Sequence, residues 1–141
     1  MIYYTSYINS PMIKEILNSN YKEKGIEVFT IMRYPSPWFK RYYPNVKNLE
    51  NLSPFPYLKY SYDKGSMDFD TFAKTYIKQI SEDFTKPLTE LDKYKDKIVI
   101  LCCCEKDDGV CHRSALRQLI PNSKELSKED FNNIMAGDLN E

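Results

Sequence analysis

The sequence predicts one α/β domain spanning residues 1–141, in which helices flank a mostly parallel sheet. Short runs rich in β-branched and aromatic residues alternate with segments whose apolar residues recur at helical spacing. Residues 97–104 (KIVILCCC) are apolar after the first lysine, which is typical of a strand buried on both faces of a parallel sheet. A chain of 141 residues is long enough for one hydrophobic core. These observations favour a three-layer, Rossmann-like arrangement.

Two strands and an intervening helix are predicted in the first part of the chain. Residues 2–8 and 26–32 have the composition of strands. Between them, Asn9-Ser10-Pro11 is typical of a helix start, because a capping residue precedes a proline that fits the first turn. Gly25 is expected to end this segment before the second strand.

Residues 33–65 contain most of the prolines and show no sustained period. We therefore expect a long loop, with at most a helical turn near residues 45–52. Loops of this length within a compact domain are uncommon and often carry function.

Helices are predicted at four places in the second half of the chain. Residues 66–84 place their apolar side chains on one face, and Ser66 or Asp68 is a suitable cap. Short helices are expected at residues 87–94, 111–119 (before Pro121) and 127–135.

Charge and hydropathy limit the classes of partner. The formal net charge is +0, so no global field attracts the chain to nucleic acid or to an anionic membrane, and any nucleic-acid contact would rest on a local patch. No run approaches the roughly 18 apolar residues that span a bilayer, and the N-terminus lacks the pattern of a signal peptide. We expect a cytoplasmic protein without membrane partners, in which clustered cysteines are more often ligands, reactive thiols or core residues than disulfides.

Every cysteine and the one histidine fall within residues 100–114, and an anion site is the first interpretation. The expected helix opens at Cys111, with Arg113 and Ser114 in its first turn. A cation at a helix N-terminus is unfavourable unless an anion lies between it and the helix. The alternative is a structural bridge from Arg113 to the acidic residues of the preceding turn (Glu105, Asp107, Asp108).

Reactive thiols and metal binding are the other two interpretations. Cys102 and Cys103 are expected to be small buried hydrophobes. Cys104 leaves the strand and Cys111 opens the helix, where a thiolate is favoured, so either is a candidate nucleophile. No CxxC pair is present, and the neighbours Cys111 and His112 are expected to diverge, so neither a metal nor another cofactor is predicted. His112 is then an orienting or acid–base group.

Aromatic and basic side chains alternate after the second predicted strand. Arg33, Tyr34 and Trp38 lie in this segment, among other rings and lysines. Such a mixture suits stacking on a nucleobase with phosphate contacts, although the rings also suit packing against the sheet edge. Because ligands of parallel sheets bind at the carboxyl ends of strands, the segments starting at Arg33 and Glu105 are expected to meet there.

These motifs resemble the family known as domain of unknown function 488 (DUF488), over most of the chain. The resemblance rests on the strand-ending Arg33 with the Pro-rich Trp-Phe-Lys loop after it, on Leu52-Ser53-Pro54, and on the Cys-His-Arg motif at Cys111. It implies an α/β fold and a site at these motifs, but no particular reaction. Many relatives carry Asp two positions before the arginine, where this chain has Ile31.

The predicted site joins three catalytic candidates to a set of ligand-binding candidates. Glu105 and His112 are the acid–base candidates, and Cys111 is the candidate nucleophile. The ligand-binding candidates are Arg33, Tyr34, Trp38, Cys104, Arg113 and Ser114. We predict an enzyme, hydrolase- or glycosidase-like, that acts on a nucleotide-like or other phosphorylated small molecule. A binding module that sequesters or senses such a molecule is the alternative. The third hypothesis is a structural or partner-binding protein whose cysteines belong to the core.

Overall fold

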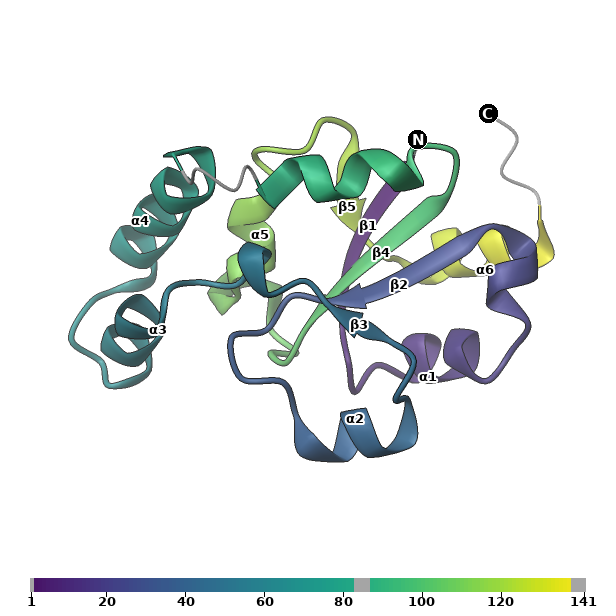
Figure 1. The fold of residues 1–141 in the computed structure, drawn as a ribbon, viewed down its shortest axis with the longest axis horizontal. Helices are drawn as coiled ribbons and strands as arrows, with labels where there is room; N and C mark the ends of the chain where they lie inside the picture. Colours follow the sequence, from purple (N-terminus) through teal and green to yellow (C-terminus); the bar gives the residue numbers. More distant parts are fainter. Residues whose placement is uncertain (1, 83–86, 138–141) are drawn as a thin grey trace.

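The computed structural model describes residues 2–82 and 87–137, which form a five-stranded, all-parallel sheet of order β3-β2-β4-β1-β5 (Figure 1). The strands are β1 (Ile2–Tyr7), β2 (Ile26–Thr30), β3 (Lys47–Asn48), β4 (Ile98–Cys103) and β5 (Ser123–Glu125). The last long strand, β4, inserts between β1 and β2 at the centre. This arrangement confirms the predicted α/β fold class.

Helices of varied length connect the strands. The α-helices are α1 (Pro11–Leu17), α2 (Pro37–Tyr42), α3 (Pro56–Asp63), α4 (Phe69–Glu82), α5 (His112–Leu116) and α6 (Lys128–Ala136). Short 3-10 helices are η1 (Tyr21–Lys24), η2 (Glu50–Leu52), η3 (Pro87–Tyr94) and η4 (Asp108–Val110). Across the described ranges, no helix is both long and apolar enough to pass through a bilayer.

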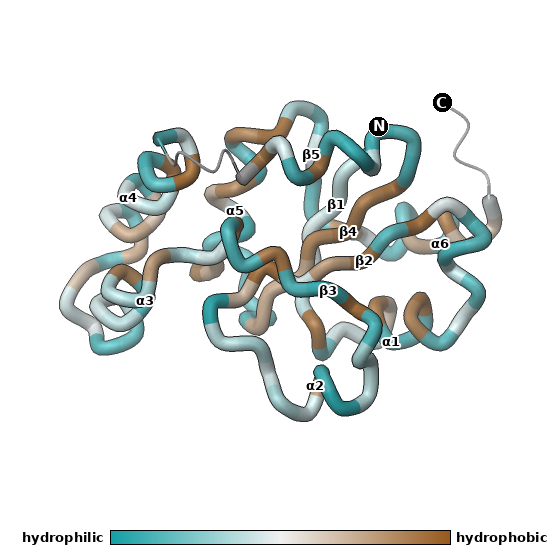
Figure 2. The backbone as a smooth tube through the Cα atoms, in the orientation of Figure 1, coloured by the Kyte–Doolittle hydropathy of each residue, from teal (hydrophilic) through white to brown (hydrophobic). Residues whose placement is uncertain are grey.

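The sheet separates two hydrophobic cores, because successive side chains of a strand point to opposite faces. Along β4, Leu101 and Cys103 pack into the core shared with α4 and α5, whereas Ile100 and Cys102 pack into the core shared with α1 and α6. Figure 2 shows β2 and β4 as the most hydrophobic central strands. The result is a three-layer domain, with the sheet between two layers of helices.

Capping side chains fix several helix starts at the predicted places. The Ser10 hydroxyl accepts a hydrogen bond from the Met12 amide at 3.2 Å, and proline follows in the first turn of α1. Asp68 accepts from the Thr71 amide at 2.8 Å just before α4. Ser127 and Asp130 form a reciprocal capping box at the start of α6. These contacts satisfy amide groups that have no partner within the helix.

The expectation of one long loop at residues 33–65 is wrong. This segment contains α2, β3, η2 and α3. Pro37 and Pro56 occupy the first turns of α2 and α3, where a residue without an N–H is tolerated and its fixed φ favours the helix. The prolines therefore start helices here, rather than marking irregular chain.

The C-terminal part of the chain differs from the prediction in one added strand and one shorter helix. The short edge strand β5 pairs with β1 but has a polar sequence, so its pattern did not predict a strand. The helix expected at residues 111–119 is regular only over α5, which ends at Leu116. Residues 83 and 84 of the predicted helix at 66–84 lie outside the described residues.

Candidate functional site

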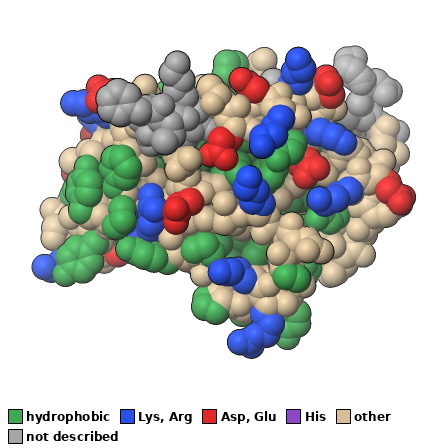
Figure 3. Space-filling model, in the orientation of Figure 1, with side chains coloured by type: hydrophobic (Ala, Val, Ile, Leu, Met, Phe, Trp, Pro, Cys, Tyr) green, Lys and Arg blue, Asp and Glu red, His purple; other side chains and the backbone are tan. Residues whose placement is uncertain are grey.

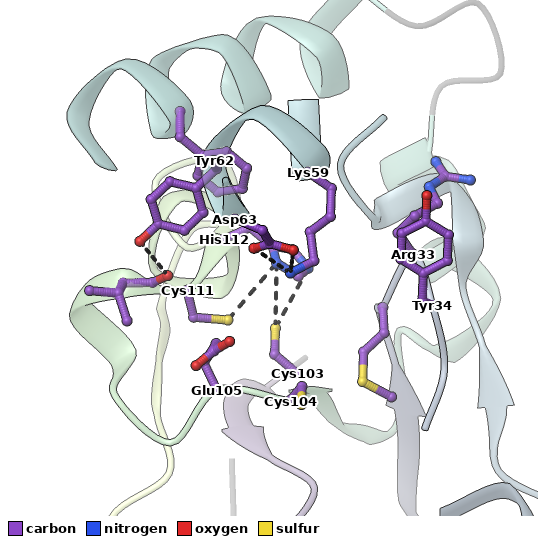
Figure 4. A pocket seen from close by; sticks show the side chains of 13 residues that line it. Arg33, Tyr34, Lys59, Tyr62, Asp63, Cys103, Cys104, Glu105, Cys111 and His112 are labelled. Carbon is purple, nitrogen blue, oxygen red and sulfur yellow. Dashed lines mark hydrogen bonds and ion pairs between the residues drawn. The ribbon is translucent and has the colours of Figure 1, made fainter. Parts of the chain in front are cut away.

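A cavity of about 270 Å³ opens at the carboxyl edge of β2 and β4 (Figure 4). The segment after β2 reaches it with Arg33 and Tyr34, and the segment after β4 reaches it with Cys104 and Glu105. The two segments therefore meet at one edge of the sheet, as the sequence predicts. The remaining lining side chains are Met32, Lys59, Tyr62, Asp63, Phe72, Cys103, Val110, Cys111 and His112.

Cys103, Cys111 and His112 converge at one side of this cavity. The Cys111 Sγ lies 3.9 Å from Nδ1 of His112, and the Cys103 Sγ lies 4.0 Å from Nδ1 and 3.6 Å from Nε2. All three residues are buried, and all the cysteines are free thiols. We refer to these three residues as the Cys-His cluster.

The expected divergence of Cys111 and His112 is wrong, because the two residues straddle the start of a helix. Cys111 is the N-cap of α5 and has extended backbone dihedrals (φ −115°, ψ 142°), while His112 is the first helical residue. The Asp107 side chain accepts a hydrogen bond from the Gly109 amide at 2.9 Å and shapes the preceding turn, η4. The change of backbone conformation at Cys111 lets both side chains turn towards Cys103.

A backbone carbonyl orients the His112 ring. Its Nε2 lies 2.7 Å from the Ile31 carbonyl oxygen, directly after β2. A carbonyl oxygen only accepts hydrogen bonds, so Nε2 carries the proton and donates it. Nδ1 is then unprotonated and lies 3.9 Å from the Cys111 Sγ, while the Cys103 Sγ lies beside the ring, nearer Nε2. The Tyr76 ring packs edge-on against the imidazole at 5.2 Å. The imidazole is therefore held in one orientation by β2 and α4.

The two buried thiols of the cluster have opposite tendencies to ionise. Burial and the hydrogen bond to Cys111 raise the pKa of Cys103 well above its ordinary value. Burial also opposes ionisation of Cys111, but its contacts with Cys103 and His112 outweigh it and lower the pKa of Cys111. Burial, with the nearby Glu105 carboxylate, raises the pKa of Cys104. A thiolate is thus best accommodated at Cys111, with the shared proton on Cys103.

Arg113, an expected anion ligand, does not line the cavity. It is 0% exposed, and its guanidinium bonds the Glu125 carboxylate at 3.0 Å, the Lys106 carbonyl at 3.1 Å and the Glu105 carbonyl. Asp108 lies 3.3 Å from Nε. Arg113 thus ties the turn after β4 to β5. Its structural bridge is to Asp108, one of the three acidic residues that the sequence offers as partners, and mainly to Glu125, which lies outside that set.

Ser114 and Trp38 also lie away from the cavity lining. The Ser114 hydroxyl donates to the Cys111 carbonyl at 2.9 Å, so it supports the helix start. The Lys14 Nζ lies over the Trp38 ring, 5.6 Å from its centroid, in a separate surface hollow with Tyr42 and Tyr43. The structure therefore does not bring Trp38 together with the Cys-His cluster.

The remaining aromatic rings of residues 33–65 divide between core and surface. Phe39 is buried, whereas Phe55, Tyr57 and Tyr60 are exposed. Figure 3 shows hydrophobic side chains gathered over α3 and α4 on the face in view. Tyr62 stacks on Phe72 with ring centroids 4.4 Å apart and lines the cavity.

Sequence reasoning missed several lining residues, and Cys103 is the most important. Cys103 was expected to be inert core, but it shares its sheet face with α5, which carries Cys111 and His112. Side chains alternate along a strand, so Cys103 faces the opposite side of the sheet from Cys102, and this alternation is the signal in the sequence. Lys59 and Asp63 form an ion pair of 3.0 Å on α3, and their spacing of four residues was a helical signal inside the presumed loop.

A family model described as the active DUF488-N3 subclade (DUF488-N3a) matches residues 12–124. The chain belongs to the DUF488 family. The DUF488-N3a match spans the segments that carry the cavity, from the end of β2 to α5. No curated protein and no solved structure matches the chain.

Proposed function

We propose that this protein is an enzyme that hydrolyses a nucleotide-like, phosphorylated small molecule bound in the cavity. The observation that carries the proposal is the Cys-His cluster, which places two thiols and an oriented imidazole at a cavity of about 270 Å³. Concave pockets with a few converging polar groups are the usual place for small-molecule chemistry. The description of the matched subclade as active is consistent with an enzyme.

Two aromatic and two basic side chains support the substrate class. Tyr34 and Tyr62 offer ring faces or edges to a base, and Arg33 and Lys59 offer positive charge to a phosphate. Arg113 is fully buried and does not line the cavity, so recognition of phosphate falls to Arg33 and to Lys59, whose ion pair with Asp63 a phosphate would have to displace. The Arg33 Nε donates to the Pro54 carbonyl at 2.9 Å, which fixes the side chain. Its Nη1 makes only a long ion pair, of 3.6 Å, with the exposed Glu50 carboxylate.

Glu105 is the candidate general base. Figure 4 shows its carboxylate directed towards the space beside Cys111, on the segment that leaves β4. In the proposed reaction, Glu105 takes a proton from water as the oxygen attacks the substrate, and then returns that proton to the leaving group. The thiols and the imidazole of the Cys-His cluster line the same side of the cavity, next to the place where the substrate would react.

The experiment is turnover of a panel of nucleoside phosphates and sugar phosphates, with products separated by chromatography. Glu105→Gln should lower kcat by about 10²–10⁴-fold, the usual contribution of a general base, while binding survives. Binding is followed by thermal shift, since a ligand at about 100 times its Kd adds about 2.7 kcal/mol to stability. Lys106→Ala, an exposed neighbour whose side chain does not line the cavity, is the matched control.

The binding-module alternative makes a different prediction. A module that only sequesters the ligand would show the thermal shift and return every ligand intact. Equal kcat in wild type and Glu105→Gln would remove Glu105 from the mechanism.

A further inference from the structure

Within residues 2–82 and 87–137, three potential metal ligands converge at one place. The sulfurs of Cys103 and Cys111 and a ring nitrogen of His112 all lie within 4.8 Å of one another, and all three residues are buried. We propose that the Cys-His cluster binds a zinc ion whose fourth coordination position faces the cavity. The site itself stands on this geometry, and its role in turnover rests on the proposed function. It reverses the sequence-based expectation that no metal is bound.

The distances within the cluster are close to those that zinc requires. Zinc binds thiolate at about 2.3 Å and imidazole at about 2.0–2.1 Å, so tetrahedral coordination separates sulfur and nitrogen by about 3.6 Å. The Nδ1 of His112 lies 3.9 Å from the Cys111 Sγ and 4.0 Å from the Cys103 Sγ. Each sulfur therefore needs to approach Nδ1 by only about 0.3–0.4 Å around an ion.

His112 already has the outer contact of a metal ligand. Metal-binding histidines almost always donate the second ring N–H to a carboxylate, backbone carbonyl or water, which fixes the ring. Here Nε2 donates to the Ile31 carbonyl at 2.7 Å, and Nδ1 remains as the ligand atom. The three ligands are also tied to different parts of the fold, since Cys103 ends β4 and the other two begin α5.

The donor set selects the ion. Two thiolates and one imidazole are soft to borderline ligands and suit zinc better than magnesium or calcium, which prefer oxygen. Two thiolates also neutralise a divalent cation within a buried site. Zinc sites with three protein ligands leave one position open for water or substrate, and catalytic sites keep this arrangement. All three side chains line the cavity, so the open position has a place for a small molecule.

The metal would supply a specific step in the proposed reaction. Zinc held by Cys103, Cys111 and His112 would lower the pKa of a bound water, and Glu105 is placed to take the proton from that water as its oxygen forms the new bond to the substrate. The substrate bond to the leaving group breaks, and Glu105 returns the proton to that group. Atoms and charges balance without an oxidant or reductant.

Cobalt(II) substitution tests the site without an activity assay. Reduced protein is stripped with a chelator, Co²⁺ is titrated, and visible spectra are recorded. Wild type should show the thiolate-to-cobalt and tetrahedral d–d bands at one Co²⁺ per chain, and zinc should abolish them by displacement. Cys111→Ser and Cys103→Ser should each weaken or remove the charge-transfer bands.

Cys104→Ser is the matched control, because Cys104 is adjacent to the cluster in sequence but exposed and outside it. This variant should keep the wild-type spectrum. Circular dichroism checks that each variant is folded, and Cys111→Ser stands in if Cys103→Ser fails to fold. Absence of the bands in wild type, or their equal loss in Cys104→Ser, would overturn the site.

Turnover by chelated protein separates this inference from the proposed function. Unchanged turnover without metal would leave the enzyme assignment standing and remove zinc from the mechanism. Cobalt bands together with no turnover of any phosphorylated ligand would leave the metal site standing and contradict the proposed function.

Discussion

Arg113 is a charged side chain with no exposed surface, and its partners explain how the fold accommodates it. Burying an unpaired guanidinium would cost several kcal/mol. Glu125 and Asp108 supply opposite charge, and the carbonyls of Glu105 and Lys106 accept further hydrogen bonds. Hydrogen bonds to the Glu125 carboxylate keep the pKa of Arg113 above its ordinary value despite burial. Arg113 therefore holds the cavity-bearing turn in place from behind.

Arg113→Ala should lower the free energy of unfolding by about 3 kcal/mol, which urea denaturation measures. Removing one partner of a buried pair typically costs about 3–5 kcal/mol. The lower end applies because the side chains of Glu125 and Asp108 remain 32% exposed. Arg41→Ala, an exposed arginine on α2, should change stability by no more than about 0.5 kcal/mol. Equal urea midpoints for the two variants would argue against the structural role.

At the scale of elements, α4 secures the segment that carries the cavity rim. Gln79 donates to the Ser53 carbonyl at 3.0 Å and accepts from the Phe55 amide at 2.8 Å. Tyr76 donates to the Leu52 carbonyl one turn earlier. The carbonyl of Pro54, which lies between Ser53 and Phe55, accepts a hydrogen bond from Arg33. Helix α4 therefore positions Arg33 through this segment.

Gln79→Ala should destabilise the protein by about 1–3 kcal/mol, because it leaves the buried Ser53 carbonyl and the part-buried Phe55 amide without this partner. It should also weaken binding of phosphorylated ligands, since Arg33 loses its fixed support. Urea denaturation and ligand thermal shifts measure the two effects. Lys78→Ala, on the exposed side of the same helix, is the control and should resemble wild type. A Gln79→Ala variant with unchanged stability would mean that the segment is held by other contacts.

The elements also show what sequence patterns can predict. The apolar run of β4 and the serine caps of α1 and α6 are local signals. The sequence therefore predicts the strand β4 and the starts of both helices. The meeting of the β2 and β4 carboxyl ends followed from parallel topology. The two helices inside residues 33–65 were missed because proline both ends and begins helices, and local sequence does not separate the two cases.

The site was less predictable than the fold because its geometry depends on distant contacts. The convergence of Cys103 with Cys111 and His112 requires α5 to pack on one particular face of β4. The burial of Arg113 depends on Glu125, which lies on the unpredicted strand β5. Neither relation has a local sequence signal.

At the scale of the whole molecule, the sheet order predicts a gradient of local stability. β4 is central, flanked on both sides and buried between the helical layers. β3 and β5 lie at the edges and contain two and three residues, respectively. Edge and short elements open more readily than central ones.

Amide hydrogen exchange should therefore be slowest in β4, intermediate in β1 and β2, and fastest in β3 and β5. Exchange followed by mass spectrometry of peptides, or by NMR, measures this order. The amides of the solvent-facing helix α3 serve as the reference for fast exchange. Exchange from β4 as rapid as from β3 would contradict the sheet order.

The Ile31 carbonyl that orients His112 has a consequence for how the site tolerates mutation. The acceptor belongs to the main chain, so every amino acid at position 31 supplies the same oxygen, provided that β2 keeps its path. An aspartate there, as in the Asp-Val-Arg pattern of relatives, would change the side chain and leave this acceptor in place. The orientation of the imidazole is thus encoded in the course of the main chain after β2, whereas the Ile31 side chain, which is fully buried in the core, answers to packing alone.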